Sequence, residues 1–440
     1  MDLSVLLELA VVIGCILVGV RFGGVGLGIW GGVGLCILTM GFGITPTSPP
    51  IDVILIIIAV VTAASAMEAS GGIEYLVYVA EKIIRSNPKR ITIIAPLVTW
   101  VFGFFTGTSH ICYPLQPVIY EVAHSAGIRP ERPLALSVTT AMLAIAGSPV
   151  SAATAAMIGL FASAKITGFD LPQIMAITMP SSILAIVITG FICMHYGKDL
   201  KDDPEYQKRL AAGLVTAEEH TQNKEVPVRA KRAALIFIIG TLLIVLSGIV
   251  PVLRTMPGHA EPLTMHTALE IYMFLVAAVI LAVCRPKVAD IPKSNTMQAG
   301  LVALVGIFGL AWLGDSFIGA HKTALVSMAG DFVQQYPWVF AFVLFLVSGL
   351  LMSQAATTRA IMPLGIALGI PPQLLVAMFP AVGGIFILPA YGTQLSAIAF
   401  DRAGTTKIGR FVLNHSFMFP GVTVITFTVV IGFAIASIFN

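Results

Sequence analysis

The sequence predicts an all-α polytopic membrane protein that contains two inverted-topology repeats. First, 57% of the 440 residues are hydrophobic and only 11% are charged, whereas about a quarter of the residues of a soluble protein are charged. Second, the apolar segments reach roughly 20 residues, the length that a helix needs to cross a hydrocarbon core of about 30 Å. Third, short polar stretches with prolines interrupt the apolar segments in the same order in both halves of the chain.

Hydropathy and helix-breaking residues predict about ten full spans and two re-entrant hairpins. The spans are expected near residues 4–20, 24–43, 51–69, 134–163, 172–196, 233–253, 266–284, 297–314, 374–400 and 411–438. The regions 91–124 and 338–369 are apolar but broken in the middle, so each is expected to enter and leave on one side of the membrane. With this arrangement 21 of the 25 Lys and Arg residues fall on one side, which the positive-inside rule makes cytoplasmic. Both termini are then periplasmic.

The order of elements divides the chain into two repeats. Residues 1–196 hold the first hairpin (91–124) and a broken span (134–163), and residues 233–440 hold the second hairpin (338–369) and a second broken span (374–400). Four proline pairs keep the same register: Pro88 and Pro337, Pro117 and Pro363, Pro130 and Pro372, Pro149 and Pro389. The hydrophilic stretch 197–232 is expected to be a cytoplasmic linker, because it offers too little apolar material for a core. Segments 73–85 and 318–335 are expected to be interfacial amphipathic helices before each hairpin.

The polar interruptions predict a substrate site. Irregular backbone at membrane depth is tolerated where it is buried or lines an aqueous cavity, and inverted repeats with paired broken helices are typical of secondary transporters. Each break also exposes main-chain N–H groups at the start of the next helix, which attract anions. The candidate substrate-binding residues, at the two hairpin tips and the two breaks, are Gly107, Thr108, Ser109, His110, Ser148, Pro149, Ser151, Ser353, Gln354, Thr357, Thr358, Arg359, Pro389, Tyr391, Thr393 and Gln394.

Charged residues within the apolar segments have two interpretations each. Arg359 would grip a substrate carboxylate, or it would snorkel or pair with an acid. His110 would donate to an anion or be a hydrogen-bonded structural residue. For Glu68 and Asp315, a role at a helix end or domain interface is favoured over proton transport.

Charges near the predicted cytoplasmic side have structural interpretations. Glu121 is expected to pair with Arg129 or Arg132, and His415 is expected to be packed and hydrogen-bonded. Asp401, followed by Arg402 near the end of a span, would pair structurally or gate access.

No metal, cofactor or nucleic-acid partner is expected. The five cysteines stand singly in apolar stretches, without the spacing of a metal site. An intramembrane enzyme is disfavoured because Ser109 and His110, the only nucleophile and base side by side, point in different directions on a helix. A channel would not need two hairpins of opposite sidedness.

Six stretches resemble the anaerobic C4-dicarboxylate (Dcu) transporters of bacterial inner membranes. They are PPIDVILIIIAVVTAASAMEASGG, SNPKRITIIAP, AGIRPERPLALS, GSPVSAA, SQAATTRAIMP and FDRAGTTKIGRFVLNHSFMFPG. The resemblance implies transport of fumarate, succinate, malate and aspartate, with fumarate/succinate exchange foremost. It also implies the ion-transporter superfamily fold, a homodimer whose scaffold domain supports a mobile transport domain that moves as an elevator.

Two positions depart from the pattern of that family. The first tip reads GTSH (107–110) where GTGH is expected, and AYGT (390–393) stands where a TYP-like turn is expected. Both lie in the candidate site, so the preferred dicarboxylate stays open. A sodium- or proton-coupled symporter of a related small carboxylate is the alternative function.

Overall fold

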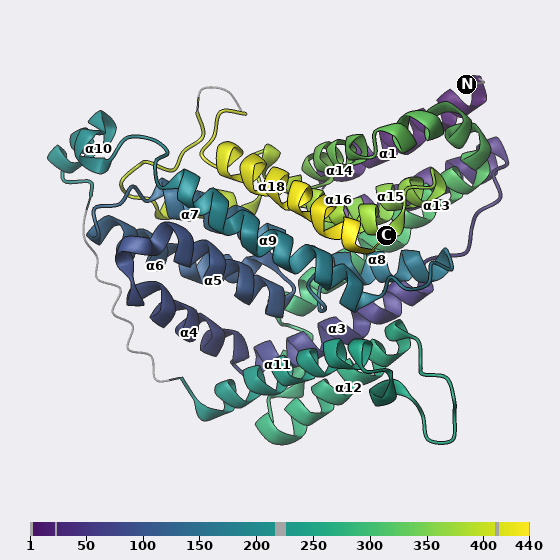
Figure 1. Ribbon diagram of the computed structural model, residues 1–440, viewed down its shortest axis with the longest axis horizontal. Helices are drawn as coiled ribbons and strands as arrows, with labels where there is room; N and C mark the ends of the chain where they lie inside the picture. Colours follow the sequence, from purple (N-terminus) through teal and green to yellow (C-terminus); the bar gives the residue numbers. More distant parts are fainter. Residues whose placement is uncertain (1–2, 23, 216–225, 410–412, 440) are drawn as a thin grey trace.

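The computed structural model describes residues 3–22, 24–215, 226–409 and 413–439 (Figure 1). Residues 216–225 of the predicted linker and the first two residues of the last predicted span lie outside this set. The described residues are helical throughout, apart from loops and two isolated β-bridges, Thr255 with Pro262 and Ile408 with His415. The all-α prediction is confirmed.

The described residues of the first half form nine α-helices. They are α1 (Leu3–Phe22), α2 (Gly26–Cys36), α3 (Ile51–Ala69), α4 (Gly72–Ser86), α5 (Ile91–Thr106), α6 (Cys112–Ser125), α7 (Glu131–Leu143), α8 (Ala152–Ser163) and α9 (Leu171–Cys193). A π-helical turn, Ile37–Gly41, extends α2.

The short helix α10 (Pro204–Ala211) lies in the linker, and the second half follows it. That half comprises α11 (Val228–Ile249), α12 (Met265–Cys284), α13 (Asn295–Gln335), α14 (Trp338–Leu351), α15 (Gln354–Ala367), α16 (Pro372–Met378), α17 (Gly392–Phe400) and α18 (Met418–Ala436).

Each predicted hairpin forms two helices with a short turn between them. In the first, α5 ends at Gly107, whose φ of +66° is left-handed, and a 3₁₀ turn (Ser109–Ile111) leads into α6. In the second, α14 ends at Met352, also left-handed with φ +49°, and Ser353 caps α15 by accepting from the Ala356 N–H over 3.3 Å. A left-handed residue ends a helix abruptly and reverses the chain. Re-entry from one side of the membrane stays a prediction.

Both predicted broken spans are broken in the structure. The chain leaves α7 at Leu143 and re-enters a helix at Ala152, where Ser151 caps α8. In the second broken span, α16 tightens into a 3₁₀ segment (Phe379–Ile387), and α17 then starts at an angle of 57°.

The prediction of a separate interfacial helix at 318–335 is wrong. Helix α13 runs without interruption from Asn295 to Gln335. In the first half the matching position does break, since α3 and α4 meet at 74°. Gly71 makes that bend, with a φ of +84° that a side chain would resist. Gly319, at the matching point of the second half, keeps helical backbone, so nothing turns the chain.

Fewer helices reach membrane-spanning length than the ten spans expected. Among the described residues, six helices are long and apolar enough to cross a membrane, or up to eight if each bent pair counts as one span. The described apolar stretches of α1 and of α2 with its extension are shorter than 18 residues. The sidedness of the loops and termini stays a prediction.

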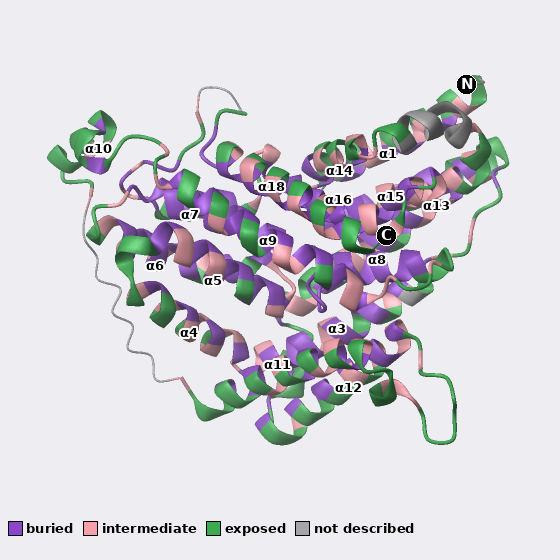
Figure 2. Cartoon of the chain, viewed as in Figure 1, coloured by how far each residue is buried: buried purple, intermediate pink, exposed green. Residues whose placement is uncertain are grey.

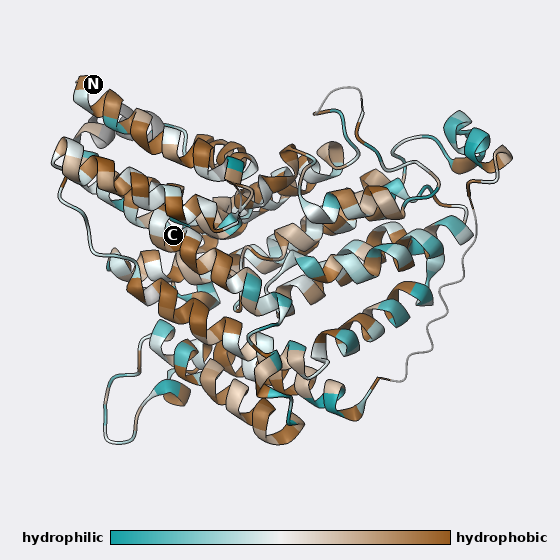
Figure 3. Ribbon diagram, turned by 180° about the vertical axis from the view of Figure 1, so that it is seen from behind, coloured by the Kyte–Doolittle hydropathy of each residue, from teal (hydrophilic) through white to brown (hydrophobic). Residues whose placement is uncertain are grey.

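Burial and hydropathy separate an inner group of helices from an outer one. Every residue of α7 is buried, and Figure 2 shows the buried residues concentrated in α7 and α16, with exposed residues frequent on α11 and α12. The exposed residues of those outer helices include large apolar side chains such as Ile239, Leu242 and Phe274. Figure 3 shows that these helices are hydrophobic, whereas α10 is largely hydrophilic. Apolar outer surfaces of this kind suit a lipid environment.

Ion pairs dock the linker onto the start of α7. Arg129 binds Glu131 over 2.6 Å and also donates to Asp203, the capping residue of α10. Arg132 donates to Asp199 over 2.9 Å. The predicted pairing of Glu121 with Arg129 or Arg132 is therefore wrong, because Glu121 pairs with Arg85 of α4 over 2.8 Å.

The polar residues around the loop 401–417 serve its structure. Asp401 accepts hydrogen bonds from the Thr405 hydroxyl, over 2.6 Å, and from the Thr406 N–H, over 2.5 Å. His415 is 5% exposed and contacts the Ile387 carbonyl oxygen through Nε2 over 3.0 Å. The expectation of a packed, hydrogen-bonded His415 is confirmed.

Candidate substrate-binding cavity

Both hairpin tips and both helix breaks line one cavity of about 1030 Å³. The first tip contributes 106–111, the second tip 351–356, and the breaks contribute Ile145, Val150, Ile385 and Tyr391. Helices α3 and α13 form the facing wall. Segments nearly 250 residues apart thus surround one space, which we call the large cavity.

Gly107 is required at the first tip for two reasons. Its φ of +66° disfavours any residue with a side chain. A Cβ at this position would also lie 2.4 Å from the Val150 carbonyl oxygen. The tip therefore packs backbone to backbone against the first broken span, and the Thr108 hydroxyl then accepts from the His110 N–H over 3.2 Å.

His110 and two tyrosines form an aromatic cluster at the large cavity. The His110 ring centroid lies 5.7 Å from that of Tyr113 and 6.4 Å from that of Tyr391, and His110 Nε2 lies 3.5 Å from the Tyr391 hydroxyl. Tyr113 and His110 belong to the first hairpin, while Tyr391 precedes α17. Sequence reasoning missed Tyr113, although its place three residues after His110, on the next helical turn, was a usable signal.

Two glutamine side chains, one from each hairpin, connect that hairpin to the broken span of the other half. Gln116 of α6 donates from Nε2 to the Thr393 carbonyl oxygen over 2.7 Å. Gln354 of α15 donates in the same way to the Met142 carbonyl oxygen over 2.6 Å. Both glutamines are buried, so these bonds form away from water and define how the four polar segments meet.

The electrostatics of the large cavity come from main-chain groups rather than from cationic side chains. Among the described residues that line it, none is Lys or Arg, and the acids are Glu68 and Glu74. Helices α8 and α15 start at its wall, at Ala152 and Gln354. The first N–H groups of a helix have no intrahelical acceptor and carry partial positive charge. The large cavity can therefore hold an anionic group without an ion pair.

Seven of the sixteen predicted site residues line the large cavity. They are Gly107, Thr108, Ser109, His110, Ser353, Gln354 and Tyr391.

Most of the other predicted hydroxyls and amides bind the backbone instead. Ser148 donates to the Phe104 carbonyl oxygen over 2.6 Å, and Ser151 to that of Ile145 over 2.7 Å. Further along the chain, Thr357 donates to the Ser353 carbonyl oxygen, Thr358 to that of Gln354 and Gln394 to that of Phe386. Pro149, Pro389 and Thr393 do not line the large cavity either. These residues shape the tips and breaks.

Glu68 has a structural role at the wall of the large cavity. Its carboxylate accepts from the main-chain N–H of Asn295 over 3.0 Å and of Thr296 over 2.9 Å, and also from the Thr296 hydroxyl. A carboxylate at a helix N-terminus stabilises the unpaired N–H groups and the helix dipole. The expected helix-end role of Glu68 is confirmed.

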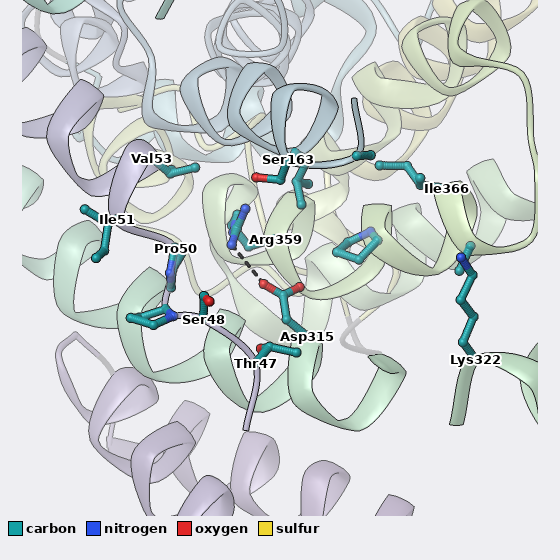
Figure 4. A pocket seen from close by; sticks show the side chains of 15 residues that line it. Thr47, Ser48, Pro50, Ile51, Val53, Ser163, Asp315, Lys322, Arg359 and Ile366 are labelled. Carbon is teal, nitrogen blue, oxygen red and sulfur yellow. Dashed lines mark hydrogen bonds and ion pairs between the residues drawn. The ribbon is translucent and has the colours of Figure 1, made fainter. Parts of the chain in front are cut away.

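Arg359 lies outside the large cavity and pairs with an acid. Its guanidinium NH2 is 2.9 Å from Asp315 Oδ2 on α13. Figure 4 shows the two side chains facing each other in a second cavity, of about 570 Å³, which we call the small cavity. The interpretation of Arg359 as one half of an ion pair is confirmed, and the structure separates it from the hairpin tips.

The described residues contain no group of three or more His, Cys, Asp or Glu side chains that could hold a metal ion. Across residues 4–440, the sequence matches the pattern of the family described as anaerobic C4-dicarboxylate membrane transporter. The chain belongs to this family. Its members are transporters, and the protein is not an enzyme.

Individual members of the family align with almost the whole chain. The anaerobic C4-dicarboxylate transporter DcuB of Escherichia coli O6:H1 is 38% identical over 99% of both chains. The C4-dicarboxylate transporter DcuA of Wolinella succinogenes is 39% identical over 98% of this chain and 99% of its own.

A solved structure shares the fold. The YdaH transporter of Alcanivorax borkumensis superposes with a TM-score of 0.61 over 93% of this chain and 97% of its own, at 17% identity. That similarity concerns the fold alone.

Proposed function

We propose that the protein exchanges C4-dicarboxylates such as fumarate, succinate, malate and aspartate across the bacterial inner membrane. The observation that carries the proposal is the single cavity that both hairpin tips and both breaks line. A C4-dicarboxylate has an anionic group at each end, so it needs two sets of donors some distance apart. The two halves of the chain provide one set each. The family relatives named C4-dicarboxylate transporters supply the substrate class.

The donors at the large cavity divide into two groups. In the first half, Ser109 and His110 of the tip accompany the N–H groups at the start of α8. In the second half, Ser353 accompanies the N–H groups at the start of α15, and Tyr391 adds a hydroxyl. We assign direct substrate contact to these side chains. The other predicted site residues on the tips and breaks support them by holding the backbone in place.

Exchange follows from the charge of the large cavity when it is loaded or empty. Convergent N–H dipoles without a ligand are costly to move through a low-dielectric layer, whereas bound carboxylates satisfy them. The loaded transport domain, which carries the hairpins and broken spans, then crosses more readily than the empty one. The inverted repeats give this domain two related positions, as in an elevator, and a homodimer would hold the scaffold domains still in the membrane.

The test is a counterflow experiment with purified protein in proteoliposomes. Vesicles loaded with labelled fumarate should release it slowly into buffer and at least about tenfold faster when succinate is outside. Malate and aspartate should compete, and citrate, with a third carboxylate, should not. Efflux that ignores external dicarboxylate would overturn exchange, and equal competition by citrate would overturn the substrate class.

A coupled symporter is the second candidate, and one observation favours it. Glu68 and Glu74 line the same cavity as the proposed anionic substrate, and a co-transported Na⁺ or H⁺ would offset their repulsion. A sodium or proton gradient should then drive uptake into vesicles without internal substrate. Uptake that requires internal dicarboxylate and ignores both gradients would exclude this candidate.

A further inference from the structure

The same four helices line both the large and the small cavity. Helix α3 packs against α13 and α8, and α15 packs against α13 and α8, so the four form a closed square. On α13, the residues that line the large cavity lie between 295 and 306, and those that line the small cavity are Asp315 and Lys322. At a rise of 1.5 Å per residue, Gly306 and Asp315 are about 14 Å apart along this helix. The two cavities are two ends of one interface.

A layer of buried side chains separates the two cavities. From the four helices it includes Ile56, Ile57, Ala156, Met157, Ile307, Ala311, Thr357 and Thr358, each no more than 1% exposed. The hydroxyls of Thr357 and Thr358 donate to carbonyl oxygens of their own helix. This layer therefore offers no free polar group to a passing ion. In the described conformation the path is closed at this level.

The small cavity has the chemistry of an anion site. Arg359 is 3% exposed, yet the described residues provide it with one partner, Asp315, and its Nε has none. Among the described residues of the lining, the cations are Arg359 and Lys322 and the acid is Asp315. A buried guanidinium with unused donors is costly, and a carboxylate is the group that best matches its planar set of donors.

The surroundings of the two cavities differ in charge. Residues 47–51 line the small cavity, and the loop 44–50 contains no Lys or Arg, so the basic residues nearest this cavity outside its ion pair are Lys165 and Lys322. The large cavity includes Asn295 and Thr296, which directly follow the basic stretch Arg285 to Lys293. By the positive-inside rule the two cavities then face opposite sides of the membrane.

We propose that the small cavity is a second carboxylate-binding site at the far mouth of the substrate path, with Arg359 as its receptor and Asp315 as the resident carboxylate that a dicarboxylate displaces. This inference rests on the proposed function and adds a place where substrate pauses before or after the large cavity. When the substrate leaves, Asp315 takes back the Arg359 donors. The guanidinium therefore always has a carboxylate partner. Release of the substrate then leaves no unpaired buried charge that would hold the substrate back.

The test separates this role from a purely structural ion pair. Replacing both partners with apolar residues, in an Arg359→Met/Asp315→Met variant, removes the charges without leaving one unpaired, which is often neutral for stability. We expect a wild-type melting temperature and at least about a tenfold loss of fumarate exchange, the cost of one charge-assisted contact. Exchange at the wild-type rate in this double variant would overturn the proposal. Since wild-type exchange is measured first, a failure of the proposed function would appear separately.

A single substitution keeps the proposal testable if the double variant does not fold. Asp315→Asn removes the competitor of the substrate but retains its size. The KM for fumarate applied from the side of the small cavity should fall about threefold or more. If the pair only held α15 against α13, the KM would stay constant or rise, and that result would count against a carboxylate site.

Labelling provides a third readout that does not depend on transport rates. In a Cys36→Ser background, in which the other four cysteines are buried, Ser163→Cys introduces an exposed thiol on the wall of the small cavity. Saturating fumarate should slow its modification by a charged thiosulfonate reagent about threefold or more. Ser86→Cys, exposed at the end of α4 and remote from both cavities, should react at the same rate with and without fumarate. If fumarate leaves the modification rate of Ser163→Cys unchanged, as it does that of Ser86→Cys, the substrate binds elsewhere.

Discussion

Gln354 Nε2 donates to the Met142 carbonyl oxygen over 2.6 Å, and this bond joins the tip of the second hairpin to the first broken span. Gln354 is 4% exposed and Met142 is fully buried. Gln116 makes the opposite connection, from the first hairpin to the Thr393 carbonyl oxygen in the second broken span. Both carbonyl oxygens lie next to a helix break, and that of Met142 also accepts from the Ile145 N–H over 3.3 Å, so the glutamine is an additional donor to a buried acceptor. The two glutamines thereby connect each hairpin to the broken span of the other half.

Gln354→Met should destabilise the protein and impair exchange. The substitution keeps the volume but removes one donor from the buried Met142 carbonyl, which still accepts from the Ile145 N–H over 3.3 Å, at a cost of about 0.5–1.5 kcal/mol. Thermal unfolding in detergent should show a lower melting temperature than wild type. The exposed Gln207 of α10 also donates to a main-chain oxygen, so Gln207→Met is the matched control and should change little. If both variants lower the melting temperature by the same amount, the Gln354 hydrogen bond contributes no more to stability than the exposed one of Gln207.

Tyr391→Phe should weaken substrate binding more than turnover. It removes the hydroxyl that lies 3.5 Å from His110 at the large cavity, while the ring remains. Loss of one hydrogen bond of about 1 kcal/mol corresponds to roughly a fivefold rise in KM. Initial rates of fumarate exchange over a concentration series provide the comparison, with Tyr78→Phe on the exposed face of α4 as the control. An unchanged KM would remove Tyr391 from the proposed contacts.

Glu68→Gln should lower stability without changing the pH dependence of exchange. Glu68 accepts three hydrogen bonds at the N-terminus of α13, and loss of an anionic cap costs about 0.5–2 kcal/mol. Glu74 lines the same cavity, so Glu74→Gln tests whether any acid at this wall has the same effect. Exchange that loses its pH dependence only in Glu68→Gln would instead identify Glu68 as a proton carrier.

Asp203→Asn should release α10 at neutral pH. Burial alone would raise the pKa of Asp203, but its bonds to Arg129 and to the N–H groups of Tyr206 and Glu205 lower it below the ordinary value. A carboxylate with a lowered folded-state pKa contributes stability above its unfolded-state pKa of about 3.9 and loses it as the pH falls through the folded-state value.

Hydrogen exchange at α10 is the measurement for this variant. At pH 7, α10 should be less protected in Asp203→Asn than in wild type. The difference should shrink as the pH falls from the ordinary pKa of a carboxylic acid through the lower folded-state pKa of Asp203, because the wild-type carboxylate then becomes protonated and loses its bond to Arg129. Asp202→Asn, at an exposed neighbour, is the control. A difference that stays constant with pH would assign the docking of α10 to contacts other than the ion pair.

The positions of the helices could largely be predicted from the sequence, because they depend on local chemistry. Apolar length determines spans, and Gly107 and the polar tips interrupt them wherever they occur. The resemblance carried by stretches such as SQAATTRAIMP was sufficient for the family. The prediction of a separate helix at 318–335 was wrong because a continuous helix that contains Gly319 has the same composition as a bent one.

The roles of individual polar side chains depended on tertiary structure. A serine or threonine in a helix can donate to a carbonyl three or four residues earlier, so Thr357 and Thr358 resemble ligand donors in sequence although their hydroxyls are occupied. Arg359 finds Asp315 44 residues away, a pairing that no local pattern specifies.

By itself, the sequence determined that this chain is a helical membrane transporter with two polar hairpins and two broken spans, because hydrophobicity, glycine and proline act over a few residues. Only the tertiary structure decided that both tips line one cavity, that α13 runs unbroken past two cavities, and that Arg359 faces Asp315 instead of the tips. Those outcomes depend on which helices pack together. Packing brings together residues that are far apart in the chain, and the local sequence does not encode it.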